Sequence, residues 1–118
     1  MRRGDIFWAV FDPVRGSEAN KRRPCVIVSN DAANRMAWGL RQGVVTVVPT
    51  TTNIARIQPF QVLIRAGASG LTRDLKAQTE QIRALSIERF EARIGAVATA
   101  EMAQIDAALR LQLDLIHR

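Results

Sequence analysis

The sequence predicts an α+β, mainly β fold in which a strongly bent, barrel-like antiparallel sheet is closed by a C-terminal helix. Short runs rich in Val, Ile, Phe and Thr recur through most of the chain, and turn residues separate them. The segment after Thr99 changes to the helical spacing of apolar residues. The length of 118 residues fits a single domain that spans residues 1–118.

Strands are expected wherever a short apolar run lies between polar or turn segments. The valine-rich run at 43–49 is the strongest such pattern, whereas residues 76–85 form a less regular extended segment. Loops are expected over 12–23, 50–58 and 66–70. The expected strands are 5–11, 24–29, 43–49, 60–64 and 93–98.

Helices are expected after residues that cap helix N-termini with side-chain oxygens. The C-terminal helix is the clearest, and Glu101 lies in its first turn, where the helix dipole favours negative charge. The expected helical segments are 32–36 after Asn30 and Asp31, a short turn at 87–90 after Ser86, and 100–113 after Thr99. One apolar stripe predicts that the last helix packs on the core, through Met102, Ile105, Leu109 and Leu113.

The formal net charge is +6 at pH 7, and the whole excess lies in the N-terminal half of the chain. Residues 1–65 hold ten Lys and Arg and four Asp and Glu, whereas residues 66–118 hold seven of each kind. Fifteen of the 17 basic residues are Arg, whose planar guanidinium binds phosphate through paired hydrogen bonds. The charge pattern therefore favours a polyanionic partner, with nucleic acid first.

Several classes of site lack the residues that they need. The only histidine, His117, lies next to the C-terminus, and the sequence has no Cys/His cluster, so neither a two-histidine ribonuclease nor a zinc site is expected. No glycine-rich nucleotide motif occurs, and we expect no cofactor. Cys25 lies in an apolar run and is expected to be a buried thiol rather than a nucleophile. The lone cysteine, with no long apolar run and no signal peptide, predicts a cytoplasmic protein without membrane contact.

The remaining polar residues permit metal-free cleavage of RNA. In that reaction the 2′-hydroxyl attacks the adjacent phosphate, and the protein supplies a base, cations for the phosphate charge and a proton donor. Arg23 suits charge stabilisation but is a poor base, because the pKa of a guanidinium lies far above neutrality. Glu18 is the better candidate for the base, and Thr51 can donate a hydrogen bond to a phosphate oxygen. From residue types alone, a solvated loop is the alternative explanation of this segment.

Short motifs follow one another along nearly the whole chain. They are R-G-D at 3–5, D-P-V-R-G-S-E at 12–18, R-P-C-V-I-V-S-N at 23–30, V-V-P-T-T at 47–51, E-Q-I-R at 80–83, I-D-A-A-L at 105–109 and L-D-L at 113–115. In this order and at this spacing, the series resembles the MazF/PemK family of endoribonuclease toxins. Each motif is weak alone, and the ordered series is strong.

The resemblance implies an SH3-like (CcdB/PemK-like) barrel with a C-terminal helix, and a homodimer that binds single-stranded RNA along its groove. It implies metal-independent cleavage at a short sequence, which leaves a 2′,3′-cyclic phosphate and a 5′-hydroxyl and inhibits translation and growth. It also implies neutralisation by a cognate antitoxin whose acidic, flexible tail occupies the RNA site.

The resemblance also assigns site residues. The family's catalytic Arg falls on Arg23, its catalytic Thr on Thr51 and the acid of its G-S-E stretch on Glu18. Gln81 and Arg83 match the family's late strand, where a structural or dimer-contact role is the alternative to an RNA role. The residues expected to contact RNA are Arg15, Lys21, Arg22, Trp38, Thr50, Asn53 and Arg83.

The sequence departs from the family's pattern at two places, one residue and one short segment. Leu75 stands where a small polar residue is usual, and residues 77–79 are more polar than the usual aliphatic strand. Both are expected to lie away from Arg23 and Thr51, so they put the pairing of that strand in question rather than the activity.

Two tryptophans can in principle stack on nucleobases, which bind aromatic rings whatever their sequence. Trp8 lies within an expected strand, so we expect it in the core. Trp38 follows a polar segment and is the better candidate for stacking.

Two other functions remain open. One is a protein-binding toxin on the same fold, similar to the CcdB-type gyrase poisons, whose gyrase contact lies in a tryptophan-containing C-terminal end; this chain has no Trp there. The other is a catalytically silent RNA-binding relative, against which the retention of Glu18, Arg23 and Thr51 argues.

Overall fold

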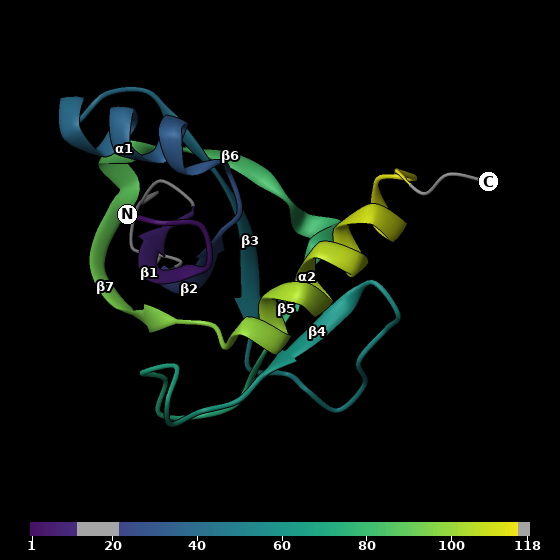
Figure 1. Ribbon diagram of the computed structural model, residues 1–118. Coiled ribbons are helices and arrows are strands. Elements are labelled where there is room, and N and C mark those ends of the chain that lie inside the picture. Colours follow the sequence, from purple (N-terminus) through teal and green to yellow (C-terminus); the bar gives the residue numbers. More distant parts are fainter. Residues whose placement is uncertain (12–21, 116–118) are drawn as a thin grey trace, which may run out of the picture.

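The computed structural model describes residues 1–11 and 22–115, which form a curved sheet flanked by two α-helices (Figure 1). Over these residues, neither helix is long and apolar enough to cross a bilayer. In chain order the elements are β1 (Asp5–Val10), β2 (Arg22–Ile27), α1 (Asp31–Leu40), β3 (Val44–Thr51), β4 (Gln61–Ile64), β5 (Leu75–Gln78), the 3₁₀ turn η1 (Thr79–Gln81), β6 (Arg83–Ser86), the 3₁₀ turn η2 (Ile87–Arg89), β7 (Phe90–Ala96) and α2 (Thr99–Gln112).

The strands pair in antiparallel fashion and the sheet bends around β3. Its pairing follows the order β4-β5-β3-β2-β1-β7, and β6 also pairs with β3. The first half of β3, from Val44 to Val47, pairs with β6, whereas Thr50 and Thr51 at its end pair with β5. Because two strands share one edge of β3, the sheet curls into the barrel-like shape visible in Figure 1. The fold class expected from the sequence is confirmed.

Alternating side chains of β2 and β3 supply two separate hydrophobic layers. Val26 and Val48 belong to the first layer, to which α2, β4 and β5 also contribute. Cys25 and Val47 belong to the second layer, to which α1 and β6 contribute. Since both faces of these strands are buried, their sequences are continuous apolar runs rather than alternating patterns.

Helix α2 packs on the first layer with only part of its expected stripe. Ile105 and Leu109 are buried, and Met102 packs against the same layer. Leu113 is 46% exposed, so its expected place in the core is wrong. The reason is that α2 ends at Gln112, and Leu113 lies beyond the region that the helix covers.

The N-terminus of α2 is satisfied by a residue other than the expected cap. The helix begins at Thr99, so the capping position falls on Ala98, which has no side-chain acceptor. Instead, the Glu101 carboxylate accepts hydrogen bonds from the backbone N–H of Ala98 at 3.0 Å and from that of Arg65 at 2.9 Å. Glu101 therefore joins the start of the helix to the loop after β4.

Asn30 caps α1 as expected, whereas Ser86 does not cap the 3₁₀ turn η2. The Asn30 side chain accepts a hydrogen bond from the backbone N–H of Ala33 at 2.9 Å, and the helix runs past its expected end. Ser86 precedes η2 but makes no capping hydrogen bond. A three-residue turn leaves fewer unpaired N–H groups than a helix, so it depends less on a cap.

The extended segment expected over 76–85 is two strands separated by a turn. β5 pairs with the end of β3, and β6 pairs with its beginning, so the chain travels along β3 between them. Thr79 in η1 is fully buried, and its hydroxyl donates a hydrogen bond to the backbone carbonyl of Phe60. This anchored turn separates the two strands.

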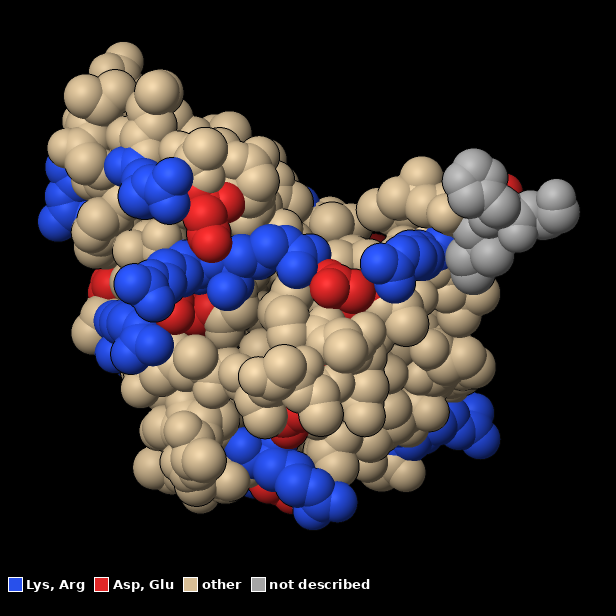
Figure 2. Space-filling view, viewed as in Figure 1, with Lys and Arg blue, Asp and Glu red and all other residues tan. Residues whose placement is uncertain are grey.

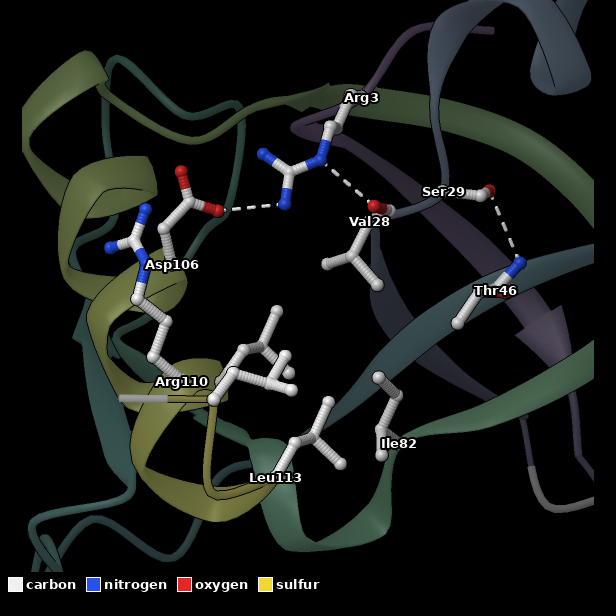
Figure 3. A pocket seen from close by; sticks show the side chains of 10 residues that line it. Arg3, Val28, Ser29, Thr46, Ile82, Asp106, Arg110 and Leu113 are labelled. Carbon is white, nitrogen blue, oxygen red and sulfur yellow. Dashed lines mark hydrogen bonds and ion pairs between the residues drawn. The ribbon is translucent and has the colours of Figure 1, made fainter. Parts of the chain in front are cut away.

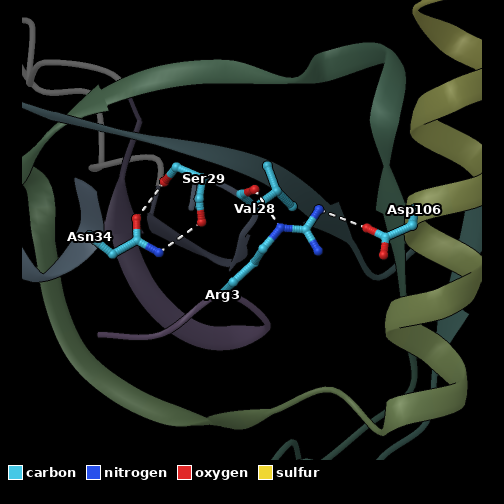
Figure 4. Close-up of polar contacts among 5 residues, drawn as sticks. All are labelled: Arg3, Val28, Ser29, Asn34 and Asp106. Atoms are coloured by element: carbon cyan, nitrogen blue, oxygen red, sulfur yellow. Dashed lines mark hydrogen bonds and ion pairs between the residues drawn. The ribbon is translucent and has the colours of Figure 1, made fainter. Parts of the chain in front are cut away.

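Arg3 connects three elements through its backbone and side chain. Its guanidinium donates to the Val28 carbonyl at 2.8 Å and to the Asp106 carboxylate of α2 at 2.7 Å (Figure 4). Its backbone N–H donates to Asp31 at the start of α1 at 2.6 Å, and this hydrogen bond is the main reason that the pKa of Asp31 lies below its ordinary value. The N-terminal segment thus holds both helices to β2.

Helix α1 is fixed to the sheet by a buried amide. Asn34 is fully buried, and its side-chain nitrogen donates to the backbone carbonyl of Ser29 at 2.8 Å. The Ser29 hydroxyl donates in return to the Asn34 side-chain oxygen at 2.5 Å (Figure 4). It also accepts from the backbone N–H of Thr46 at 3.2 Å. A buried amide with all of these partners costs little to desolvate.

We expect Gly95→Ala to lower the free energy of unfolding by about 3 kcal/mol, because a Cβ atom there cannot be accommodated without movement of the backbone. That atom would lie 1.9 Å from the carbonyl oxygen of Ser69. Gly39→Ala is the matched control, since nothing lies within 4 Å of its Cβ and Ala favours a helix by about 0.5–1 kcal/mol. Urea unfolding of both variants is the measurement, and equal stabilities would contradict the close approach.

Candidate active site

One end of the β2–β3 pair forms a cavity that contains two of the expected catalytic residues. The antiparallel pairing of β2 and β3 ends at Cys25 and Pro49. Arg23 and Thr51 each follow two positions beyond this pair, and both line the cavity. The cavity has a volume of about 330 Å³. Its lining residues are Trp8, Arg22, Arg23, Pro24, Thr50, Thr51, Thr52 and Leu75.

The two arginines of the cavity differ in their partners. Arg22 donates a hydrogen bond to the Glu91 carboxylate, and its guanidinium lies over the Trp8 ring, 4.3 Å from the ring centroid. The Arg23 side chain is exposed and makes no hydrogen bond or ion pair with another residue that the structure describes. The charge of Arg22 is balanced by a protein carboxylate, whereas that of Arg23 is available to an anion in the cavity.

Thr51 is half-buried, and its hydroxyl is oriented by the loop that follows. Its Oγ1 accepts a hydrogen bond from the backbone N–H of Asn53 at 3.3 Å, and the Asn53 side chain accepts one from the backbone N–H of Ala55 at 3.3 Å. Because the hydroxyl accepts this bond, its own proton is free for donation. Asn53, expected to contact RNA, holds this loop and does not itself line the cavity.

Thr50 was expected to contact RNA, but its side chain is buried. It is 1% exposed, and its hydroxyl donates to the backbone carbonyl of Pro24 at 2.7 Å. Adjacent residues of a strand face opposite sides, so Thr50 and Thr51 have different surroundings. Thr50 joins β3 to β2 directly beside Arg23, which gives it a positioning role.

Leu75 lines the same cavity as Arg23 and Thr51, so the expectation that this position lies away from them is wrong. The physical reason is the pairing of β5, which places Lys76 opposite Thr51. Leu75 is 3% exposed and supplies an apolar wall. The Lys76 ammonium donates a hydrogen bond to the backbone carbonyl of Arg56 at 2.6 Å and does not line the cavity.

Trp8 does not lie in the core as expected, whereas Trp38, the better candidate for stacking, is also partly buried and does not line the cavity of Arg23. Trp8 is only partly buried and lines the cavity beside Arg22 and Arg23. Trp38 packs on Phe7 in the second hydrophobic layer, with ring centroids 5.4 Å apart, and the Arg41 guanidinium lies 4.3 Å from its centroid. The register of β1 and β2 explains the place of Trp8, since Trp8 pairs with Pro24 and is adjacent to Ala9, which pairs with Arg23.

The other expected site residues are separate from the cavity or outside the described residues. Arg83 is exposed on β6, and its guanidinium lies 5.6 Å from the centroid of the Phe11 ring; neither it nor the exposed Gln81 lines the cavity. The expected base and two basic contacts lie within 12–21, outside the described residues: Glu18, Arg15 and Lys21.

The remaining chemistry-bearing groups offer no second catalytic centre within the described residues. Cys25 is fully buried, and burial raises the pKa of its thiol from the ordinary 9.0 to about 12, so it is not a nucleophile at neutral pH. Across residues 1–11 and 22–115, no three His, Cys, Asp or Glu side chains gather where a metal ion would bind.

A second cavity, of about 510 Å³, lies between α2 and the ends of β2 and β3 (Figure 3). The ion pair of Arg3 and Asp106 lies on its wall, and Ile82 and Leu113 supply apolar surface. It contains none of the expected catalytic residues. We call it the helix cavity.

Basic side chains form a band across the face between α1 and the end of α2, and acidic side chains interrupt it (Figure 2). Three ion pairs join described residues: Arg3 with Asp106 at 2.7 Å, Arg93 with Asp5 at 3.1 Å, and Arg22 with Glu91. These three arginines therefore have a carboxylate partner within the protein, which distinguishes them from Arg23.

Residues 2–113 match the model of a family described as PemK-like, MazF-like toxin of type II toxin-antitoxin system. The chain belongs to this family. This MazF-like toxin is 57% identical to Endoribonuclease MazF9 of Mycobacterium tuberculosis over 115 residues, which cover 98% of each protein. It is 33% identical to Endoribonuclease MazF of Staphylococcus epidermidis over 115 residues, 98% of this chain and 92% of that protein. A mycobacterial endoribonuclease solved with its cognate antitoxin has a TM-score of 0.76 at 27% identity, covering 100% of this chain and 99% of that one.

In this MazF-like toxin, we expect Thr50→Val to lower the free energy of unfolding by about 1–2 kcal/mol. The change preserves the shape of the side chain but leaves the Pro24 carbonyl without its donor. The sign is diagnostic, because a buried Thr that made no hydrogen bond would gain stability as Val. Urea unfolding is the measurement, with the exposed Thr52→Val as control; a more stable Thr50→Val would contradict the bond.

Proposed function

We propose that this MazF-like toxin is a sequence-specific endoribonuclease that cuts single-stranded RNA without a metal ion. The observation that carries the proposal is the position of Arg23, whose side chain has no described protein partner, together with Thr51 in the lining of one cavity. Two relatives that align with nearly the whole chain are named endoribonucleases, which supports the same activity here.

In the proposed reaction, the RNA supplies its own nucleophile. A 2′-oxygen forms a bond to the adjacent phosphorus while the bond from phosphorus to the 5′-oxygen breaks, which leaves a 2′,3′-cyclic phosphate and a 5′-hydroxyl. Negative charge grows on the non-bridging phosphate oxygens in the transition state. Arg23 stabilises that charge, and Thr51 donates its hydroxyl proton in a hydrogen bond to one of these oxygens.

Two proton transfers complete the reaction. The 2′-hydroxyl loses its proton to a base, and the 5′-oxygen gains a proton as it leaves. The described lining of the cavity has no carboxylate or imidazole, so we assign the base to Glu18 in the segment 12–21. Arg15 and Lys21 in the same segment, together with Arg22, are the proposed phosphate contacts. This assignment rests on the motif.

We infer that a cognate antitoxin neutralises the toxin, since a mycobacterial endoribonuclease of the same fold is solved in complex with its cognate antitoxin. Cleavage of cellular RNA would stop translation and growth, so the host cell needs such a partner. An exposed cation without a counter-ion among the described residues, as at Arg23, suits the acidic and flexible tail of an antitoxin. The tail would then compete directly with RNA.

We further propose that the toxin is a homodimer that associates through the helix cavity. Leu111, Leu113 and Leu115 at the end of α2 are 47%, 46% and 64% exposed, and the last two line this cavity. Adjacent to it, β6 pairs only with β3 among the described strands, so its other edge is open. Exposed leucines and an open strand edge are features that a second copy of the chain would cover.

The first test is cleavage of a long, unstructured RNA by the purified protein in excess EDTA. We expect cuts at one short sequence, with cyclic phosphate and 5′-hydroxyl ends. Arg23→Ala should reduce kcat by about 10²–10³-fold, because it removes the main charge stabilisation of the transition state. The matched control is Arg35→Ala, which removes an exposed arginine of α1 that does not line the cavity.

Two outcomes would contradict this function. Full activity of Arg23→Ala would remove the catalytic assignment. Intact RNA with a folded protein that still arrests growth would instead favour the CcdB-type alternative, in which the toxin binds gyrase.

The dimer is tested by sedimentation equilibrium of Leu113→Glu. We expect the parent to be a dimer at micromolar concentration and the variant to be mostly monomeric, because a buried unpaired carboxylate would be costly. Leu40→Glu is the matched control, since Leu40 is 68% exposed on α1 and does not line the helix cavity. A monomeric parent, or a dimer that only Leu40→Glu dissociates, would refute this interface.

A further inference from the structure

The cavity of Arg23 and Thr51 opens beside a third, smaller cavity, of about 200 Å³. We call it the side pocket. The two share four lining residues, which are Trp8, Pro24, Thr52 and Leu75. A group bound in the side pocket therefore lies next to any phosphate held at Arg23.

The side pocket has the size and chemistry of a binding site for one flat ring. A cavity of about 150 Å³ holds a benzene ring, so this volume accommodates one nucleobase and not two. Leu71 and Ile94 line it together with the shared residues Trp8 and Leu75, and apolar and aromatic walls are typical of pockets that hold a base removed from its stack.

Trp8 is held in place between the two cavities. The Arg22 guanidinium lies 4.3 Å from its ring centroid, and Glu91 in turn accepts a hydrogen bond from Arg22. This arrangement fixes the indole, which is the one aromatic group shared by both cavities. A fixed ring can bind a base without first losing its own freedom of rotation.

Arg73 adds a positive charge at the side pocket. It is exposed, lines this pocket and not the cavity of Arg23, and makes no ion pair with another described residue. Consecutive phosphates of a nucleic acid flank each nucleoside. A base in the side pocket would thus have one phosphate at Arg23 and the next within reach of Arg73.

We propose that the side pocket binds the nucleobase adjacent to the phosphate that is cleaved, and that it selects which base is accepted at that position. Thr72 and Arg73 are the specificity-determining and strand-binding residues of this subsite. The proposal rests on the endoribonuclease function proposed above and extends it to the recognition of sequence.

The first variant fills the pocket. Thr72 is exposed and lines only the side pocket, so Thr72→Phe blocks it without altering the Arg23 cavity. We expect kcat/KM on the preferred RNA to fall about tenfold or more. On RNA that has an abasic ribonucleotide at the position beside the cut, parent and variant should differ by less than about twofold. Thr99→Phe, at an exposed threonine of α2, is the control and should match the parent on both substrates.

The abasic substrate separates recognition from structural damage, because a damaged protein would cut both RNAs more slowly. Sequencing of the fragment ends from a randomised RNA gives a second measure. Thr72→Phe should broaden or change the preference at one position beside the cut and leave the others intact.

The second variant removes the charge. Arg73→Gln should raise KM for all sequences alike and make the dependence of binding on salt less steep, because one phosphate contact is lost. Arg65→Gln removes an exposed arginine that lines neither cavity and should leave both quantities unchanged.

The outcomes distinguish the two proposals. If the parent cuts no RNA, the endoribonuclease function fails, and the side pocket fails with it. If the parent cuts RNA but Thr72→Phe keeps the rate and the preference of the parent, or loses activity equally on intact and abasic RNA, only the side pocket is overturned.

Discussion

Pairing between β2 and β3 is the interaction on which the rest of the structure depends. Each strand contributes alternate side chains to both hydrophobic layers, so both helices and all the other strands are arranged around this pair. At the open end of the pair, Arg23 of β2 and Thr51 of β3 line one cavity, so both are placed by strands rather than by a loop. Side chains placed by a strand pair of this kind hold their separation more firmly than side chains on loops.

The sequence predicted the parts of the fold and site that depend on local patterns. Val44 to Val48 are strand formers between turn residues, and Asn30 carries an oxygen that can cap α1, so both elements follow from nearby residues. The motif series predicted the family. It also singled out Arg23 and Thr51, which line one cavity in the structure. What a motif cannot give is the surroundings of each residue: Thr50 and Thr51 differ only in the face of β3 that they occupy.

The expectations that were wrong depend on contacts between distant segments. A position within a strand predicts burial for Trp8, yet Trp8 is only partly buried and lines the cavity together with Leu75 of β5. The break between β5 and β6 depends on a hydrogen bond from Thr79 to Phe60, which are far apart in the chain. Neither the side pocket nor the contribution of Leu75 has a sequence signal, since the lining of the pocket comes from β1, β2, β5 and β7, which are far apart in the chain.

The close approach of Gly95 to Ser69 bears on the rate at which a ligand would dissociate from the side pocket. Ser69 precedes Gly70, a glycine with φ of 87°, and Ile94 precedes Gly95. Gly70 and Ile94 line the side pocket, so the contact between their neighbours holds these two parts of its lining together. Walls that are already rigid add little entropy loss when a ligand is bound. Among related ligands of such a site, differences in affinity arise mainly in dissociation rates, so residence time, rather than speed of capture, would separate cleaved from uncleaved sequences.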